Sequence, residues 1–180
     1  MRNASFSSQD LEHDAATLEP VATVDLPRGG HIVDLKMSPS GDRLYALRHF
    51  ESAAPVPEPP AAVLVIDPAT RKLIHTIPYP NPRSIDVSPD GRRLWLVQNN
   101  HGAFDQLVAF DTENNFTELV SLRLDKKYRY RQVMVHRNGQ PWVLGTTPRE
   151  GTVSQIDGDT GKVIRTVPFT GMPVYLASLR

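Results

Sequence analysis

The chain has 180 residues and a mass of 20.1 kDa, with 20 basic side chains, 20 acidic side chains and no cysteine. A chain of this length can bury roughly 70% of its unfolded surface around a single core. Because the charges cancel and neither sign is concentrated in one segment, the sequence lacks the basic footprint of nucleic-acid binders. We therefore expect no nucleic-acid partner. The absence of cysteine excludes disulfides, thiol nucleophiles and thiolate metal sites.

The first twenty residues, MRNASFSSQDLEHDAATLEP, are acidic and polar where a secretory signal needs an apolar core of at least about seven residues. The sequence therefore predicts a cytoplasmic location, or an exported one if the chain is the processed product of a longer precursor. No stretch approaches the ~18 apolar residues of a membrane helix, and prolines recur along the whole chain. We expect no membrane partner.

Three segments share a pattern of two alternating apolar runs around a turn that ends in glycine. They are LKMSPSGDRLYALR, IDVSPDGRRLWLVQ and VMVHRNGQPWVLGT, with turn glycines Gly41, Gly91 and Gly139 that lie 50 and 48 residues apart. Alternation with a period of two is typical of β-strands, and Ser-Gly, Asp-Gly and Asn-Gly tolerate the positive φ of tight hairpin turns. Each segment is therefore predicted to form a pair of antiparallel strands.

A second pattern follows each hairpin and centres on an aspartate. The segments are VLVIDPATRKLIHTIP, LVAFDTENNFTELVSL and VSQIDGDTGKVIRTVP, with aspartates Asp67, Asp111 and Asp157. An aspartate that opens a short polar turn can accept hydrogen bonds from the turn's own backbone, so we interpret all three as turn formers. The two patterns together give four strands in ~45 to 50 residues, the length of one β-propeller blade.

The predicted fold class is all-β: a β-propeller of four-stranded antiparallel blades, about three and a half in number, in an incomplete ring. We expect a polar segment over residues 1–13, partly disordered or an edge strand, and a partial propeller over residues 14–180. The repeats are predicted near residues 32–77, 83–122 and 130–167, with a half-blade at 14–26 and a last inner strand at 172–179. Blades bury their faces only against other blades, so we expect a protein partner or a second copy to cover the exposed faces.

The run PRSIDVSPDGRRLWLVQNN, residues 82–100, closely resembles the YVTN family of β-propeller repeats, as does the later IDGDTGKVIRTVP. In that family SPDG joins the two inner strands, and LVQN at residues 96–99 is similar to the signature that ends the second strand. The resemblance covers Asp14 to Leu179, although the third repeat has HRNG at residues 136–139 in place of SPDG. It implies a propeller fold and no single function, because related repeats occur in surface-layer proteins, amine dehydrogenase-like subunits, lactonase-like enzymes and binding scaffolds.

Loops that enter the inner strands and leave the second strands of a propeller meet at one rim of its channel, where polar side chains can converge on a ligand. The ligand-binding candidates at these positions are His31, His49, Arg83, His101, Arg131 and Arg149. Arg83 and Arg131 occupy the same repeat position, and the candidate ligand for the group is a small anion or an acidic partner. Solvated loop side chains are the favoured alternative for all six residues.

The sequence contains no histidine pair with metal-site spacing, no G-x-S-x-G motif and no Ser/His/Asp set that spacing supports. We predict no catalytic residue, no metal and no cofactor. The expected function is a non-enzymatic binding or scaffolding module within a larger propeller or assembly. The alternative is a lactonase-like or amine dehydrogenase-like enzyme fragment with its pocket at the channel rim.

Three aromatic residues, Tyr45, Trp95 and Trp142, fall in the predicted second strands. Aromatic side chains in such strands pack between blades, so we expect all three in the core. The origin of the incomplete ring stays open between a fragment of a longer ring, a half that closes with a second copy, and a degraded copy.

Overall fold

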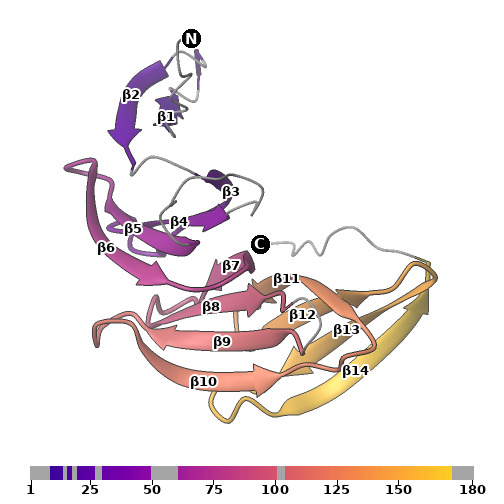
Figure 1. The fold of residues 1–180 in the computed structure, drawn as a ribbon. Helices are drawn as coiled ribbons and strands as arrows, with labels where there is room; N and C mark the ends of the chain where they lie inside the picture. Colours follow the sequence, from indigo (N-terminus) through magenta and orange to yellow (C-terminus); the bar gives the residue numbers. More distant parts are fainter. Residues whose placement is uncertain are drawn as a thin grey trace.

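The computed structural model describes residues 9–13, 16–17, 20–26, 30–49, 61–100 and 104–171. Every regular element in these residues is a β-strand. The strands form three four-stranded antiparallel sheets and one two-stranded sheet, which follow one another in chain order (Figure 1). The prediction of an all-β chain of four-stranded blades in an incomplete ring is confirmed.

The strands within each blade pair in chain order, so that each blade is a simple meander. The two-stranded sheet contains β1 (Gln9–His13) and β2 (Pro20–Asp25). The first blade contains β3 (His31–Met37), β4 (Leu44–His49), β5 (Ala62–Asp67) and β6 (Lys72–Pro78). The second contains β7 (Pro82–Val87), β8 (Arg93–Gln98), β9 (Gln106–Asp111) and β10 (Thr117–Arg123). The third contains β11 (Arg129–Val135), β12 (Pro141–Thr146), β13 (Glu150–Ile156) and β14 (Val163–Thr170).

The first strands of the blades lie along the inside of the arc. β3 contacts β7, and β7 contacts β11, whereas β6, β10 and β14 form the outer side (Figure 1). Strand β1 lies within residues 1–13 and pairs with β2, from Gln9 opposite Asp25 onwards. The predicted inner strand at 172–179 lies outside the described residues, and the predicted domain bounds stay predictions.

The hairpin turns have the conformation that the sequence predicts. Gly41, Gly91 and Gly139 have φ values of 75°, 75° and 81°, a left-handed conformation that glycine adopts without strain. In the second blade the Gly91 amide donates to the Ser88 carbonyl at 2.8 Å. The HRNG turn of the third blade keeps this bond, from the Gly139 amide to the His136 carbonyl at 2.8 Å. The turn is nevertheless one residue shorter, because the His136 amide donates to the Gln140 carbonyl, whereas the Ser88 amide donates to the Arg93 carbonyl.

The three turn aspartates bind their own turns. Asp67 Oδ1 accepts from the Ala69 amide at 2.8 Å, and Asp111 and Asp157 accept from amides two and three residues further on. Their interpretation as turn formers is confirmed. The Thr70 hydroxyl and amide, which donate to Asp67, lower the pKa of this carboxyl below its ordinary value. The amide and hydroxyl of Thr160 lower the pKa of Asp157 in the same way.

These lowered pKa values predict a loss of stability in acid. A carboxyl whose pKa is lower in the folded state stabilises the fold above its unfolded pKa of about 3.9, and this contribution disappears as the pH falls through the folded pKa. The melting temperature, followed by circular dichroism, should therefore drop as the pH falls below about 4. Thr70→Val removes the hydroxyl donor to Asp67 and should show a smaller drop. An identical acid profile in this variant would contradict the assignment.

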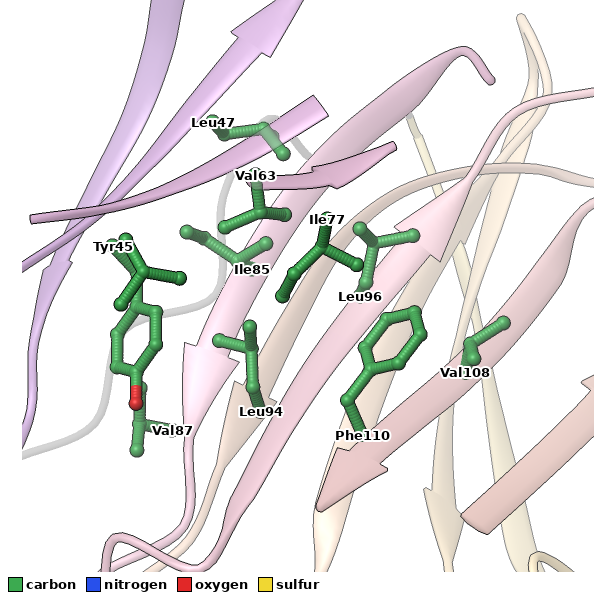
Figure 2. Packing of buried hydrophobic residues seen from close by; sticks show 11 residues of the cluster. Tyr45, Leu47, Val63, Ile77, Ile85, Val87, Leu94, Leu96, Val108 and Phe110 are labelled. Atoms are coloured by element: carbon green, nitrogen blue, oxygen red, sulfur yellow. The ribbon is translucent and has the colours of Figure 1, made fainter. Parts of the chain in front are cut away.

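The core lies between blades. Between the first and second blades, Tyr45, Leu47 and Val63 pack against Ile85 and Leu96 (Figure 2). A second cluster joins the second and third blades, and a third joins the two-stranded sheet to the first blade. Each buried aliphatic side chain of this kind contributes roughly 1.5–3 kcal/mol, so stacking of the blades holds the arc together.

Two of the three second-strand aromatics lie in this core, as predicted, and one does not. Tyr45 and Trp95 are fully buried in the inter-blade clusters. Trp142 is only partly buried, lies outside the cluster between the second and third blades, and stacks with the Arg165 guanidinium 4.9 Å from its ring centroid. The expectation for Trp142 was wrong because no blade follows on its side of the sheet within the described residues. Trp142 pairs with Met134 as Trp95 pairs with Asp86, so it lies on the face that points away from the second blade.

None of the described residues belongs to a helix that is long and apolar enough to cross a membrane.

Candidate functional site

Each innermost strand has a β-bulge at the same repeat position. In β3, β7 and β11 the pairing with the second strand shifts by one residue near the start of the strand. The extra residues are Val33, Arg83 and Arg131, and all three are exposed. A bulge bends the strand locally and redirects the side chain of the extra residue. The fold therefore gives Arg83 and Arg131, two of the predicted ligand-binding residues, a common and solvent-accessible setting.

Arg83 and Arg131 belong to adjacent inner strands that are hydrogen-bonded to each other. The Val133 amide in β11 donates at 3.4 Å to the hydroxyl of Ser84, which directly follows Arg83. Arg131 Nε donates at 3.0 Å to Thr146 Oγ1 in its own blade. The two arginines thus lie on neighbouring strands, and their role as ligand-binding residues stays a prediction.

The other candidates lie at the same ends of the strands. His31 and His49 are cross-strand partners at the start of β3 and the end of β4. Arg149 is exposed in the loop between β12 and β13, where its amide donates at 3.2 Å to Thr147 Oγ1. His101 lies outside the described residues. The described candidates are therefore spread over three blades, with His31 opposite His49 and with Arg83 and Arg131 on neighbouring inner strands.

Sequence reasoning missed a set of buried polar side chains at the ends of the second strands. They lie seven residues after the turn glycine of each blade and are Arg48, Gln98 and Thr146. Because the third turn is one residue shorter, Thr146 lies one step further along its strand than the other two. Burial lowers the pKa of the Arg48 guanidinium. The signal that reveals them is the repeat alignment, since a polar residue recurs at one position of three otherwise apolar strands.

Asp105 is a second residue that sequence reasoning missed. Its side chain is buried, accepts hydrogen bonds from the amides of Tyr130 at 2.8 Å and Asn100 at 3.0 Å, and lies 3.5 Å from Arg129 Nη1. Tyr130 and Arg129 belong to β11, so Asp105 ties the second blade to the third. The equivalent residues in the other blades are Ala61 and Gly151, and the repeat therefore gives no signal for this role.

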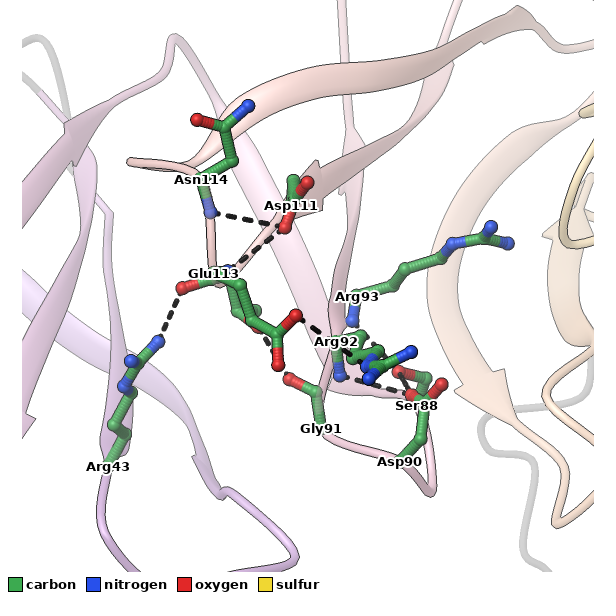
Figure 3. A network of polar contacts seen from close by, with 10 residues as sticks. Arg43, Ser88, Asp90, Gly91, Arg92, Arg93, Asp111, Glu113 and Asn114 are labelled. Carbon is green, nitrogen blue, oxygen red and sulfur yellow. Dashed lines mark hydrogen bonds and ion pairs between the residues drawn. The ribbon is translucent and has the colours of Figure 1, made fainter.

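At the opposite ends of the blades, an arginine contact recurs between neighbours. Arg43 Nη1 donates to the Thr112 carbonyl at 2.6 Å, and Figure 3 shows Arg43 reaching from the first blade to the outer turn of the second. Arg93 makes the equivalent contact one blade later, with the Gly158 carbonyl. Arg93 also pairs with Asp159 at 2.8 Å. These arginines stabilise the stacking of the blades at the turn ends.

A polar pocket of about 250 Å³ lies beside the Arg93 contact, between the turns of the second and third blades. Its walls include Ser88, Asp90, Arg93, Asn138 and Asp159. Ser88 donates to Asp90 at 2.5 Å and Arg93 binds Asp159, so these groups already bind one another. Among the described residues, no three His, Cys, Asp or Glu side chains are grouped so that they could hold a metal ion.

No protein family model and no curated protein matches the sequence. Solved structures do match. Hydrazine synthase of Kuenenia stuttgartiensis has a TM-score of 0.70 and 20% identity, over 88% of this chain and 42% of the other. A putative 6-phosphogluconolactonase from Bacteroides uniformis has a TM-score of 0.64 and 15% identity, over 91% and 48%. The WD40 repeats of RRP9 have a TM-score of 0.60 and 11% identity, over 79% and 40%.

These similarities show the fold. The chain is a partial β-propeller similar to WD40-type and lactonase-type propellers, and it spans less than half the length of the structures just named. A hydrazine synthase, a putative lactonase and a WD40-repeat protein share this architecture, so the fold by itself does not define a function. The more specific resemblance to YVTN repeats stays a prediction.

Proposed function

We propose that this chain is a non-enzymatic binding or scaffolding module within a larger propeller, and that Arg83 and Arg131 bind an anionic group at its inner edge. The observation that carries the proposal is the repeated bulge, which exposes an arginine at one position of two adjacent inner strands. Bulges are enriched beside binding and active sites because they redirect individual side chains.

The chemistry of the pair suits a carboxylate or a phosphate. Guanidinium groups keep their charge at every physiological pH, are weakly hydrated, and present parallel N–H donors that match two oxygens of such an anion. The protein as a whole has a formal net charge of zero, so this local pair does not compete with a general positive field. The expected ligand is a small anion or an acidic side chain of a protein partner.

A scaffolding role agrees with the extent of the chain. It spans 42% of the hydrazine synthase chain and 48% of the putative 6-phosphogluconolactonase, and additional blades would bring further inner strands to the same channel. A protein partner bound to an open blade face would then lie at a fixed distance from Arg83 and Arg131, as a scaffold requires. We therefore propose a protein partner, or a second copy, in addition to the anion.

The alternative is an enzyme fragment, lactonase-like or amine dehydrogenase-like. The similarity to a putative 6-phosphogluconolactonase favours the lactonase version, because that name specifies a phosphorylated substrate and two arginines suit a phosphate. Hydrolysis of 6-phosphogluconolactone by this protein, lost when both arginines are replaced, would favour the enzyme over the binding module.

Replacing both arginines should abolish anion binding and leave folding intact. In calorimetric titrations at low salt with inorganic phosphate and with a hexaglutamate peptide, Arg83→Ala/Arg131→Ala should lose at least about tenfold in affinity, or roughly 1.4 kcal/mol. The melting temperature should change little because both side chains are exposed. The matched control is Arg92→Ala/Arg137→Ala, which removes the same charge from exposed turns at the other end. Equal binding by both double variants would refute the proposal.

A further inference from the structure

The innermost strand of the first blade exposes apolar side chains that the other blades bury. Leu35 and Met37 are 42% and 50% exposed. At the same repeat positions of the second blade, Ile85 and Val87 are 0% and 9% exposed, and Val133, which aligns with Leu35 in the third, is 1% exposed. The repeat therefore places apolar residues here for a contact that the described residues do not supply.

These exposed residues continue an interface that is already formed. Leu35 lies directly opposite Ala46, so the two side chains share one face of the first blade. On that face Ala46 and Leu64 pack with Val24, which lies in β2, and with Leu26, which directly follows β2. The two-stranded sheet covers only this outer part of the face, and Leu35 and Met37 form its uncovered inner part.

Strands β1 and β2 correspond to the outer half of a blade. In the complete blades the third strand pairs with the second strand on one side and the fourth on the other. Strand β1, which corresponds to a third strand, pairs only with β2 within the described part of the chain. The edge of β1 and the face of Leu35 and Met37 thus lack the same two elements, an inner pair of strands.

Within the ranges that the structure describes, the backbone of the first blade also lacks a hydrogen bond to a preceding inner strand. The Ile85 amide donates at 3.1 Å to Asp34 of the preceding blade, and the Val133 amide donates at 3.4 Å to Ser84 of its preceding blade. The Leu35 amide, at the equivalent position, donates to the adjacent Asp34 Oδ1 at 3.0 Å. A preceding inner strand with serine or aspartate at this position would supply the acceptor that the other blades have.

We propose that the β1 edge together with Leu35 and Met37 binds a β-hairpin of a further propeller repeat. The hairpin has alternating apolar side chains on the face toward Leu35, as β4 presents Tyr45 and Leu47 to Ile85, and a serine or aspartate that accepts from the Leu35 amide. This inference rests on the proposed role within a larger propeller. It specifies which surface of the chain receives the rest of the ring.

The test uses the chain's own second hairpin as the probe. A fluorescent synthetic peptide of residues 81–100 contains β7, β8 and the acceptor Ser84, and its binding to the whole protein is followed by anisotropy. We expect saturable binding, at least tenfold weaker for Leu35→Ser/Met37→Gln and weaker for the peptide with Ser84→Ala. The control Leu119→Ser/Ile164→Ser changes two exposed apolar residues of outer strands and should bind like the wild type.

Two results would overturn the inference. One is the absence of peptide binding, or equal binding by Leu35→Ser/Met37→Gln and the wild type. The other is a wild-type dimer in sedimentation that Leu35→Ser/Met37→Gln converts to a monomer, because a second copy would then occupy the surface. Phosphate titration separates this result from the proposed function, since Leu35→Ser/Met37→Gln leaves Arg83 and Arg131 unchanged and should bind phosphate normally.

Discussion

Trp95→Ala should destabilise the protein by about 3–5 kcal/mol, the cost of removing a large aromatic side chain from a packed core. Trp95 is fully buried and packs with Val97, Leu107 and Val143 between the second and third blades. Its loss leaves a cavity at the interface that joins these blades. Because total stabilities of small domains are only 5–15 kcal/mol, much of the third blade's attachment depends on this residue.

Urea unfolding followed by circular dichroism measures this effect, and the second tryptophan provides the control. Trp142 is partly buried beside Arg165, so Trp142→Ala should cost about 1 kcal/mol. Trp95→Phe keeps most of the ring, and Trp95 Nε1 has no hydrogen-bond partner among the described residues, so this change should cost less than about 1.5 kcal/mol. If Trp142→Ala proves as costly as Trp95→Ala, the assignment of the core is wrong.

The strands and turns were predictable because their causes are local. A period of two around Gly91, with serine and aspartate before it, specifies a hairpin whatever surrounds it. The aspartate of each outer turn, such as Asp67, likewise binds amides within three residues. Repetition of both patterns then indicated the blade, and through it the propeller.

The orientation of individual side chains was less predictable, because it depends on register. Aligning the turn glycines matches Trp142 with Leu94, but the turn of the third blade is one residue shorter. The observed pairing therefore puts Trp142 opposite Met134, at the place that Trp95 holds opposite Asp86. A shift of one residue moves a side chain to the other face of a sheet. The bulges at Arg83 and Arg131 are also register effects, visible only once the pairing of each inner strand is known.

A contact between blades could not be predicted from the sequence when it occurs at only one of the blade interfaces. The arginine contact occurs twice, at Arg43 and Arg93, and alignment could have indicated it. Asp105 has no such counterpart. Its role follows from the position of β11 next to the loop before β9, which no local pattern specifies.

Asp105→Ala should therefore destabilise the protein by about 2–4 kcal/mol, because it leaves the buried Tyr130 amide without its acceptor. The change also removes the acceptor of the Asn100 amide and the ion pair with Arg129, whose half-exposed side chain can turn to water. Asp105→Asn keeps one acceptor oxygen and should fall between alanine and the wild type.

Asp125→Ala is the matched control, since Asp125 is exposed and its carboxylate accepts from the Lys127 amide of its own turn at 2.9 Å. It should cost less than about 1 kcal/mol in the same urea unfolding experiment. Hydrogen exchange adds a local measurement, because Asp105→Ala should accelerate exchange of the Tyr130 amide more than that of amides in the first blade. Equal stability of the two alanine variants would show that Asp105 does not join the second and third blades.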